Sequence, residues 1–599
     1  MQDAEQGWRP DYELFEQRLS ERLVPEGPPR RRWVRLTLVG RCRRRYLRPM
    51  TQPMTPSNHP VPQASAPISE SRPLSPAGST LSYDPATGEE VGRVPNTDLS
   101  RMPAIMARAR AAQKAWAESS FDERKRHLLK MRDYIVEHAE ELAEIVSRDN
   151  GKLRLDALTT EVIPSALAAD WYAKNAAKAL APKNLPLGSI LFINKRNQLR
   201  RVPLGVVGII SPWNYPLSIP FGEVVMGLMA GNAILLKVAA ATITVGQAIE
   251  RIVAAGGLPD GLFQHIVGSG GAVSQAFFEH GIDKVFFTGS VATGKQLMAA
   301  AAKTLTPLSL ELGGKDPMIV LEDADLERAA NGAAWAGYQN AGQSCGGVER
   351  VYVHESVYDA FVDLLAKKTR ALRHGPDRRH EVDMGAMTTQ EQLKTVERQV
   401  ELAVEAGAKI VAQSQAVGEC AKGYFYPATL VTGVDHTMEL MREETFGPVV
   451  PVMKFKTLEE AIELANDSTM ALTSSIWTRN VPLGKQIASR LESGVTTVND
   501  HLYTHGQSET PWGGWKDSGL GRTHSALGFD EMTQPKLVNW DILPAKRNIW
   551  WYPFDRPTYD GMLAALRVNF PKSVSGFLRD ASALSRLMLK KMFSPWRAE

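Results

Sequence analysis

The sequence has few cysteines, no long uncharged apolar run and no cluster of metal-ligating side chains. Three cysteines in 599 residues cannot form a disulfide framework, which favours a reducing compartment such as the cytoplasm. No stretch of about 18 uncharged apolar residues is present, which argues against a bilayer-spanning helix. Hydrophobic residues make up 43% and charged residues 23%, so collagen, coiled coil and wholesale disorder are excluded. The length suits two or three domains, and we expect no metal site.

The net charge of +4 is unevenly distributed along the chain. Residues 1–80 carry +5 and residues 549–599 carry +4, which leaves −5 on the body between them. A nucleic-acid-binding domain would carry its basic surface on the folded core, so we expect no nucleic-acid partner. Basic ends are typical of segments that touch anionic membrane surfaces, or of solvated tails.

The first 80 residues have the composition of a disordered basic and proline-rich leader. Residues 28–50 contain nine arginines and no acidic residue, and residues 51–80 contain seven prolines. Arg35 interrupts the only apolar stretch, so a secretory signal is not predicted.

Strands and helices alternate regularly after residue 200. The apolar runs 206–210, 233–237, 263–267 and 284–287 predict strands, and the stretches between them predict helices. This pattern indicates βαβ units and a parallel sheet, where nucleotides bind at the carboxyl ends of the strands. A second alternation from 317 to 498 predicts a second α/β domain, and the basic segment 190–201 could form a projecting hairpin.

These patterns divide the chain into a cofactor domain and a catalytic domain, both α/β with parallel sheets. The expected limits are the leader 1–80, a nucleotide-binding domain 81–310 (with 184–203 in an arm), a catalytic domain 311–510, a return segment and arm 511–545, and a tail 546–599.

Four residues or turns stand out chemically, although each has an ordinary structural explanation. Cys345 is flanked by small residues, but a single cysteine is more often a buried small hydrophobe. Glu311 lies between two leucines, where burial needs a partner or a role, and Asn214 could be a helix cap or an oxyanion donor. The turn Gly289–Lys295 nearly matches a P-loop but lacks its hydroxyl, because Gln296 follows.

Six motifs in a fixed order carry more information than any one of them. They are Pro212–Pro216, Phe287–Ser290, Glu311–Pro317, Gly342–Cys345, Glu443–Pro448 and Pro511–Gly519. Over residues 81–540 the chain resembles the aldehyde dehydrogenase superfamily, including its 34-residue spacing from base to nucleophile. The resemblance implies NAD(P)-dependent oxidation of an aldehyde to an acid, with Cys345 as nucleophile, Glu311 as the base that activates water, and Asn214 in the oxyanion hole.

The resemblance also implies a site for NAD or NADP. Lys237 would hold the adenosine ribose, Gly289 and Ser290 the pyrophosphate, and Glu444 with Phe446 the nicotinamide ribose; Trp213 and Gly294 belong to the same expected site. The chain departs from the family pattern at Ala240, Trp512 and Thr523, and we expect these departures to leave Asn214, Glu311 and Cys345 untouched. Ala240 removes a carboxylate that would repel a 2′-phosphate, so NADP should be accepted.

Two alternatives stay open, and the ends of the chain add two expectations. A relative that passes the acyl group to coenzyme A is the first alternative, and a catalytically inactive structural protein at a membrane surface is the second. The arm should make the protein a homodimer or homotetramer. The aromatic cluster 549–554 and the basic amphipathic stretch 574–592 could hold the tail on the cytoplasmic face of a membrane, or could pack on the enzyme's own body.

Overall fold

The computed structural model describes residues 78–377 and 380–594. The leader that we interpret as disordered lies, up to residue 77, outside the described residues.

A six-stranded sheet forms the first half of the molecule. Its order is β21-β9-β8-β5-β6-β7, and all neighbours are parallel except β21, which runs antiparallel to β9. The strands are β5 (Val206–Ile210), β6 (Ala233–Lys237), β7 (Phe263–His265), β8 (Lys284–Thr288), β9 (Leu308–Glu311) and β21 (Gly519–Leu520). β5, β6 and β8 are buried along their whole length, as expected for continuous apolar runs in a parallel sheet covered on both faces.

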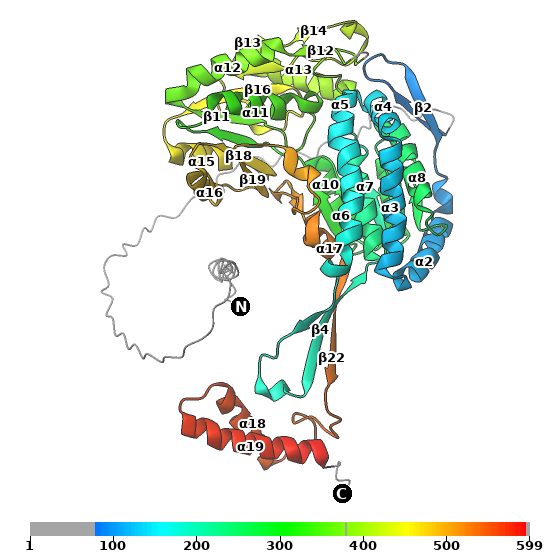
Figure 1. Ribbon diagram of the computed structural model, residues 1–599, viewed down its shortest axis with the longest axis vertical. Coiled ribbons are helices and arrows are strands. Elements are labelled where there is room, and N and C mark those ends of the chain that lie inside the picture. The colour runs from blue at the N-terminus through cyan, green and yellow to red at the C-terminus, as the bar shows by residue number, and fades with distance from the viewer. Residues whose placement is uncertain (1–77, 378–379, 595–599) are drawn as a thin grey trace, which may run out of the picture. The chain divides into compact units, whose positions relative to one another are not determined.

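Helices cover this sheet and supply its amphipathic partners (Figure 1). They are α2 (Met102–Glu118), α3 (Phe121–Glu137), α4 (Ala139–Asn150), α6 (Ile163–Ala179), α7 (Ser218–Ala230), α8 (Ile243–Gly256), α9 (Gly270–Glu279) and α10 (Val291–Ala301). Every residue of α7 is buried, because this helix is apolar on all sides except for Ser218 and Glu223. A charged residue within so apolar a helix marks the side that faces the site.

A seven-stranded sheet forms the second half, in the order β13-β15-β16-β11-β10-β18-β19. The strands are β10 (Pro317–Val320), β11 (Arg350–His354), β13 (Lys409–Gln413), β15 (Thr429–Thr432), β16 (Val449–Phe455), β18 (Thr473–Trp477) and β19 (Val495–Val498). Only β13 runs antiparallel to its neighbour. The chain passes from the first sheet to the second between Glu311 and Pro317, where the sequence predicts a domain boundary. The α/β class with parallel sheets is confirmed.

Three antiparallel strands form an arm: β3 (Lys183–Leu185), β4 (Lys195–Pro203) and β22 (Thr533–Asp541). β4 pairs with β22 over nine residues from Lys195 to Pro203, so segments more than 300 residues apart in sequence lie side by side. The expected hairpin within residues 190–201 is not formed. Ile190–Phe192 is a 3-10 turn, because Ser189 caps Leu191 N–H, and the rest belongs to the single strand β4, which pairs with β3 and β22.

The tail is a helical hairpin of α18 (Arg556–Asn569) and α19 (Val574–Phe593). α18 was not expected, and its small residues let α19 approach: a Cβ on Gly561 would lie 2.5 Å from Leu587. Leu584 and Leu587 pack in a small core with Ile549, Ala565 and Val568. Among the described residues, no helix is both long enough and apolar enough to cross a bilayer.

One basic side chain that we expected on the solvent-exposed face of the tail, Lys591, is buried within the tail. Lys591 is 2% exposed, and its ammonium donates to the carbonyls of Trp551 and Pro553 at 2.9 and 2.6 Å. It therefore closes the turn before α18 and is not available to a lipid headgroup. Lys590 is exposed and pairs with Asp555 at 3.0 Å.

Candidate active site

Cys345 lies where two cavities meet. The first has a volume of ≈ 240 Å³ and is lined by Asn214, Glu311, Glu444 and Phe446 as well as the thiol. The second has a volume of ≈ 190 Å³ and lies on the other side of Cys345, toward Trp335 and Tyr503. A thiol with a cavity on either side can meet two different molecules, and the loop before it explains how it is held there.

The loop before Cys345 is bent by three consecutive left-handed residues. Asn340, Ala341 and Gly342 have φ of 54°, 52° and 69°. Left-handed backbone is costly for residues with a side chain, and such strain gathers at functional sites. Gly342 is required here, because a Cβ would lie 2.1 Å from the carbonyl oxygen of Gly447. Ser344 N–H then donates to the Gly342 carbonyl at 2.9 Å, which closes the turn onto the thiol.

Asn214 is tied directly to this loop. Its Nδ2 donates to the Gln343 carbonyl at 3.2 Å, and Asn340 Nδ2 donates to the Asn214 carbonyl at 3.0 Å. An amide nitrogen carries two hydrogens, so the second one remains to donate to an oxygen developing beside Cys345. Asn214 and Cys345 line the same cavity.

A buried ion pair, which we did not predict from the sequence, contacts the backbone of Asn214. Lys152 Nζ donates to Glu161 at 2.6 Å and to the Asn214 carbonyl at 2.8 Å, and both side chains have 0% exposure. The second carboxylate oxygen of Glu161 accepts from the N–H groups of Leu217 and Ser218 at 2.9 and 2.8 Å, at the start of α7. Nothing in the local sequence distinguishes these two charged residues from surface ones.

Glu311 ends β9 and is almost fully buried. Burial raises the pKa of its carboxyl to about 7, while the Thr523 hydroxyl and, more weakly, the Trp512 indole act in the opposite direction. Thr523 donates a hydrogen bond directly to Glu311 Oε1. We expected the departures at Trp512 and Thr523 to leave Asn214, Glu311 and Cys345 untouched, and this expectation is wrong. β21 and the isolated β-bridge between Trp512 and Thr523 bring both residues against Glu311. A carboxyl with this pKa is poised to act as a base near neutral pH.

A second buried carboxyl, Glu223, also went unnoticed in the sequence. It lies on α7, and burial together with the nearby Glu311 raises its pKa well above the usual range. The Tyr172 hydroxyl, buried without a partner, is close enough to both carboxyls for them to raise its pKa. The available signal was a lone glutamate in an otherwise apolar helix.

The thiol itself is held in its neutral form in the described chain. Burial raises the pKa of Cys345, and the carboxyls of Glu311, Glu444 and Asp316 raise it further. The surroundings of the thiol are therefore acidic, and a positive charge nearby would favour the thiolate.

Glu444 and Phe446 are positioned by a second buried ion pair. Lys315 Nζ donates to Glu349 at 2.6 Å, and the Glu349 carboxylate accepts from the N–H groups of Thr445 and Phe446 at 3.1 and 2.9 Å. Glu444 in turn accepts from Gly314 N–H at 3.0 Å, and burial raises its pKa to about 8.

A third cavity, of ≈ 800 Å³, continues from the first one along the carboxyl ends of β5, β6 and β8. The two share Pro212, Trp213, Thr288, Gly289 and Ser290, and the third also reaches Lys237. The volume lies within the range of about 300–1,000 Å³ for cofactor sites, and the place is the usual one for nucleotides.

The N-terminus of α10 opens into this cavity. Ser290 caps the helix by accepting from Thr293 N–H at 3.3 Å, and the helix end is positive. A Cβ on Gly289 would lie 2.5 Å from the Phe287 ring, so the turn needs glycine. Phe446 and Trp213 meet edge-to-face at 5.4 Å between the first and third cavities. Gly294 does not line either cavity; it packs against Leu312.

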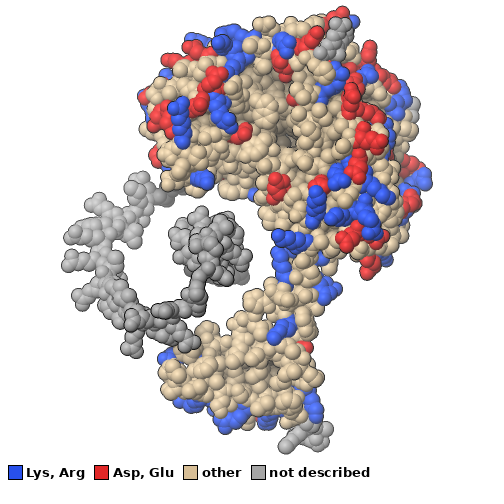
Figure 2. Space-filling model, in the orientation of Figure 1, with Lys and Arg blue, Asp and Glu red and all other residues tan. Residues whose placement is uncertain are grey.

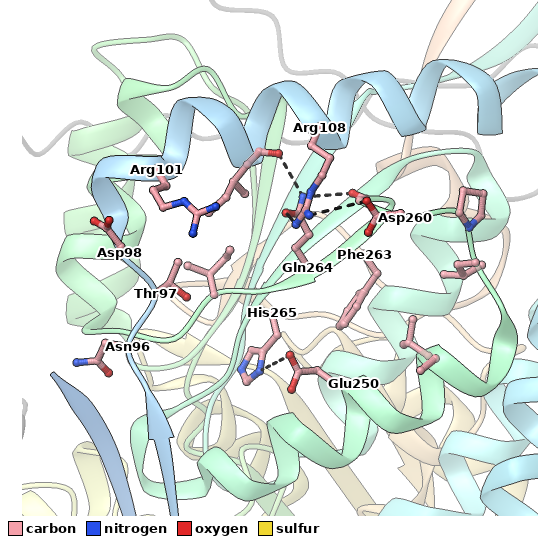
Figure 3. A pocket seen from close by; sticks show the side chains of 17 residues that line it. Asn96, Thr97, Asp98, Arg101, Arg108, Glu250, Asp260, Phe263, Gln264 and His265 are labelled. Carbon is pink, nitrogen blue, oxygen red and sulfur yellow. Dashed lines mark hydrogen bonds and ion pairs between the residues drawn. The ribbon is translucent and has the colours of Figure 1, made fainter.

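A further cavity of ≈ 880 Å³ lies away from the thiol and shares no lining residue with the other three (Figure 3). Arg108 reaches Gln264 there, and His265 lies against Glu250. Three acidic side chains, Asp98, Glu250 and Asp260, offset its arginines, and nothing links it to Cys345. Among the described residues, no group of three or more His, Cys, Asp or Glu could hold a metal ion.

Comparison with known proteins decides the family. The family model described as "Aldehyde dehydrogenase family" matches residues 75–538. The chain belongs to the aldehyde dehydrogenase family. The "4,4'-diapolycopene aldehyde oxidase" of Methylomonas sp is 36% identical, over 80% of this chain and 88% of that protein. A Mycolicibacterium smegmatis protein with the name "Putative succinate-semialdehyde dehydrogenase", NADP(+), is also 36% identical, over 76% of this chain and 87% of that one.

Solved structures agree with this membership. An aldehyde dehydrogenase of Bacillus cereus, solved as an NAD+ complex, superposes with a TM-score of 0.74 at 35% identity, over 78% of this chain and 94% of that one. The crystal structure of an E. coli NADP dependent enzyme superposes with a TM-score of 0.74 at 30% identity, over 78% of this chain and 95% of that one. The predicted class of enzyme, an aldehyde dehydrogenase that uses NAD or NADP, is confirmed.

Proposed function

We propose that this aldehyde dehydrogenase oxidises its substrate through a thioester on Cys345 and releases the acid by hydrolysis. The Cys345 thiol loses its proton to water, the thiolate attacks the aldehyde carbon, and Asn214 Nδ2 with the Cys345 N–H stabilises the resulting oxyanion. The bound NAD or NADP supplies the hydride acceptor. Glu311 then takes a proton from a water molecule, which attacks the thioester and frees the thiol. The observation that carries this proposal is the position of Cys345 between two cavities, with Glu311 on the cofactor side.

The residues along the ≈ 240 and ≈ 800 Å³ cavities fit a dinucleotide. Lys237 would hold the adenosine ribose, and Ser290 with the N–H groups at the start of α10 would hold the pyrophosphate. Glu444 would accept from the nicotinamide ribose, while Phe446 and Trp213 would bound the ring. Gly289 permits the close approach, whereas Gly294 contributes only to packing of the helix.

Two variants test the division of labour between nucleophile and base. Cys345→Ala should abolish NADH formation while cofactor binding, followed by protein fluorescence, stays nearly intact. Glu311→Gln should form one equivalent of NADH and then stop, because the thioester is made but not hydrolysed. Steady turnover by Cys345→Ala would refute the assignment.

The same assay separates the two alternatives. Turnover that depends on added coenzyme A would indicate an acyl-transferring enzyme, and no turnover with any aldehyde would indicate a structural protein. The buried Glu311 supports water as the acceptor, since its pKa of about 7 suits a base and acyl transfer to a thiol needs no activated water.

We also propose that the protein is a homodimer or homotetramer. β19 ends the seven-stranded order, and β3 ends the arm sheet with only three paired residues, so each offers an edge to another chain. A mass of about 66 kDa by light scattering at micromolar concentration would contradict this proposal.

The tail supports a proposal of peripheral contact with an anionic membrane. Large apolar side chains on its surface are at least half exposed: Trp551, Tyr552, Phe554, Phe570, Val574, Leu578, Leu589 and Phe593. Figure 2 shows the tail as a mostly uncharged surface with Lys and Arg along its margin. Aromatic rings beside basic groups are typical of helices that lie in the headgroup region.

Liposome co-sedimentation tests this contact. The full chain should pellet with vesicles containing phosphatidylserine, and a truncation after Leu543 should not. A triple variant, Phe570→Ser, Leu578→Ser and Phe593→Ser, removes only exposed side chains and should also stay in the supernatant. Equal pelleting of all three proteins would rule the tail out as the site of contact.

A further inference from the structure

The cavity on the outer side of Cys345 carries no positive charge. None of the described residues that line it is a lysine or an arginine, and its only imidazole, His505, is partly buried and has its pKa lowered to about 4 by desolvation. His505 is therefore neutral at physiological pH. The cavity offers hydroxyl and amide groups, such as Thr160 and Gln339, but no partner for an anion.

The nearest buried cation is already engaged elsewhere. Lys152 lies 4.3 Å from the centre of the Tyr215 ring, and Tyr215 lines the cavity. Its ammonium is bound to Glu161 and to the Asn214 carbonyl, and Lys152 does not line the cavity. Turning it toward a substrate would strand Glu161 as a buried, unpaired carboxylate.

The three carboxyl groups beyond the thiol supply no cation either. Glu311, Glu444 and Asp316 lie close enough to Cys345 to raise its pKa. A carboxylate on the substrate would lose its water in this cavity and gain no cation in return.

The mouth of the cavity is apolar and open to solvent. Trp335 and Tyr503 line the cavity and are still 46% and 44% exposed, which places them at the entrance. Beside the lining residue Pro164, Ile163 and Leu167 are 45% and 54% exposed one helical turn apart on α6. Exposed apolar surface at the entrance of a site marks where an apolar ligand lies.

We infer that the substrate is an uncharged aldehyde with an apolar chain, whose carbonyl reaches Cys345 and whose chain runs out along Trp335, Tyr503, Ile163 and Leu167. This inference rests on the proposed function, because it takes Cys345 as the nucleophile. An aldehyde with a carboxylate at its far end is disfavoured by the same cavity.

Two aldehydes of equal chain length test whether the cavity disfavours a carboxylate on the substrate. Butanal and succinate semialdehyde share a four-carbon chain and differ in the terminal carboxylate. We expect kcat/KM for butanal to exceed that for succinate semialdehyde by at least about 30-fold, the size expected for an unpaired anion in a buried site. We also expect kcat/KM to rise from butanal to decanal, because the longer chain covers the apolar mouth.

A variant that supplies the missing cation tests the cause. Thr160 lines the cavity and is partly exposed, so Thr160→Arg can place a guanidinium at its wall. We expect the ratio of kcat/KM for succinate semialdehyde to kcat/KM for butanal to rise at least about tenfold. Thr160→Gln is the matched uncharged control, and it should not raise this ratio by more than about threefold. A thermal melt of each variant shows whether it is folded.

The outcomes distinguish the inference about the substrate from the proposed function. Equal or better use of succinate semialdehyde by the unmodified enzyme, with butanal also oxidised, overturns the inference and leaves the proposed function intact. A flat response from butanal to decanal overturns the role of the mouth. No NADH from either aldehyde contradicts the proposed function, and the inference with it.

Discussion

The hydrogen bond from Thr523 to Glu311 should set the pH at which the enzyme turns over. Both side chains are buried, and the hydroxyl favours the ionised carboxylate, which keeps its pKa at about 7 in spite of burial. Thr523→Val keeps the shape and removes the donor. A hydrogen bond to a charged group contributes about 1.5–3 kcal/mol, and one pKa unit is about 1.4 kcal/mol. We therefore expect the pKa of Glu311 to rise to about 8 or 9.

The effect on the rate follows from the ionised fraction of the base. Glu311 accepts a proton only as a carboxylate, so hydrolysis of the thioester increases as the pH rises through its pKa. At pH 7 the ionised fraction should fall from about one half to about 1–10%, and deacylation should slow about 5- to 50-fold. At pH 10 the variant and the unmodified enzyme should converge.

Stopped-flow measurement of NADH separates the steps. The first equivalent of NADH reports acylation and should keep its rate in Thr523→Val, whereas the steady rate after it reports deacylation and should show the shifted pH profile. Thr523→Ser keeps the hydroxyl and is the matched control. If the steady rate of Thr523→Val follows the unmodified pH profile, Thr523 does not tune the base and the reasoning fails.

Three further outcomes are expected. Ala240→Glu should lower kcat/KM for NADP about 10- to 100-fold and leave kcat/KM for NAD nearly unchanged, because a carboxylate at the ribose repels a 2′-phosphate. An equal loss for both cofactors in steady-state assays would contradict this expectation. Lys315→Met should lower the free energy of unfolding by about 3–5 kcal/mol in urea, since Glu349 is left buried and unpaired, and adding Glu349→Gln should restore part of it. Glu311→Gln should stabilise the protein at pH 8 but not at pH 4. Burial raises the pKa of the Glu311 carboxyl from 4.5 to about 7, so the unmodified protein loses about 3 kcal/mol of stability as the pH rises from 4.5 to 7. A glutamine does not ionise, so the variant keeps this stability. Equal urea midpoints for this variant and the unmodified protein at pH 8 would refute the last expectation.

The sheets could be predicted from the sequence because their strands are buried on both faces. β5, β6 and β8 are continuous apolar runs, and the helices between them are long enough to be distinguished from strands. The ordered motifs then located Cys345, Glu311 and Asn214, which the fold brings to one place although Asn214 and Cys345 are 131 residues apart in the sequence.

The supports of the site could not be predicted in this way. Thr523 meets Glu311 across 212 residues, and Lys152 reaches Asn214 across 62. No periodicity connects such pairs, since their contact depends on how β21 pairs with β9 and on where the turn after α4 lies. Lysines are mostly exposed, and nothing in the sequence around Lys152 or Lys591 distinguishes these buried lysines from solvated ones.

Two of the three departures from the family pattern, Trp512 and Thr523, lie beside the base. Trp512 lines the outer cavity beside Cys345 and also lowers the pKa of Glu311, whereas Thr523 touches Glu311 without lining that cavity. One residue therefore acts on both the shape offered to the aldehyde and the readiness of the base, and the other acts on the base alone. Glu223, a further buried carboxyl, lies close enough to Glu311 for the Glu311 charge to raise its pKa. A site arranged in this way adjusts hydrolysis through the neighbours of Glu311 and leaves the nucleophile, the base and the oxyanion donor unchanged.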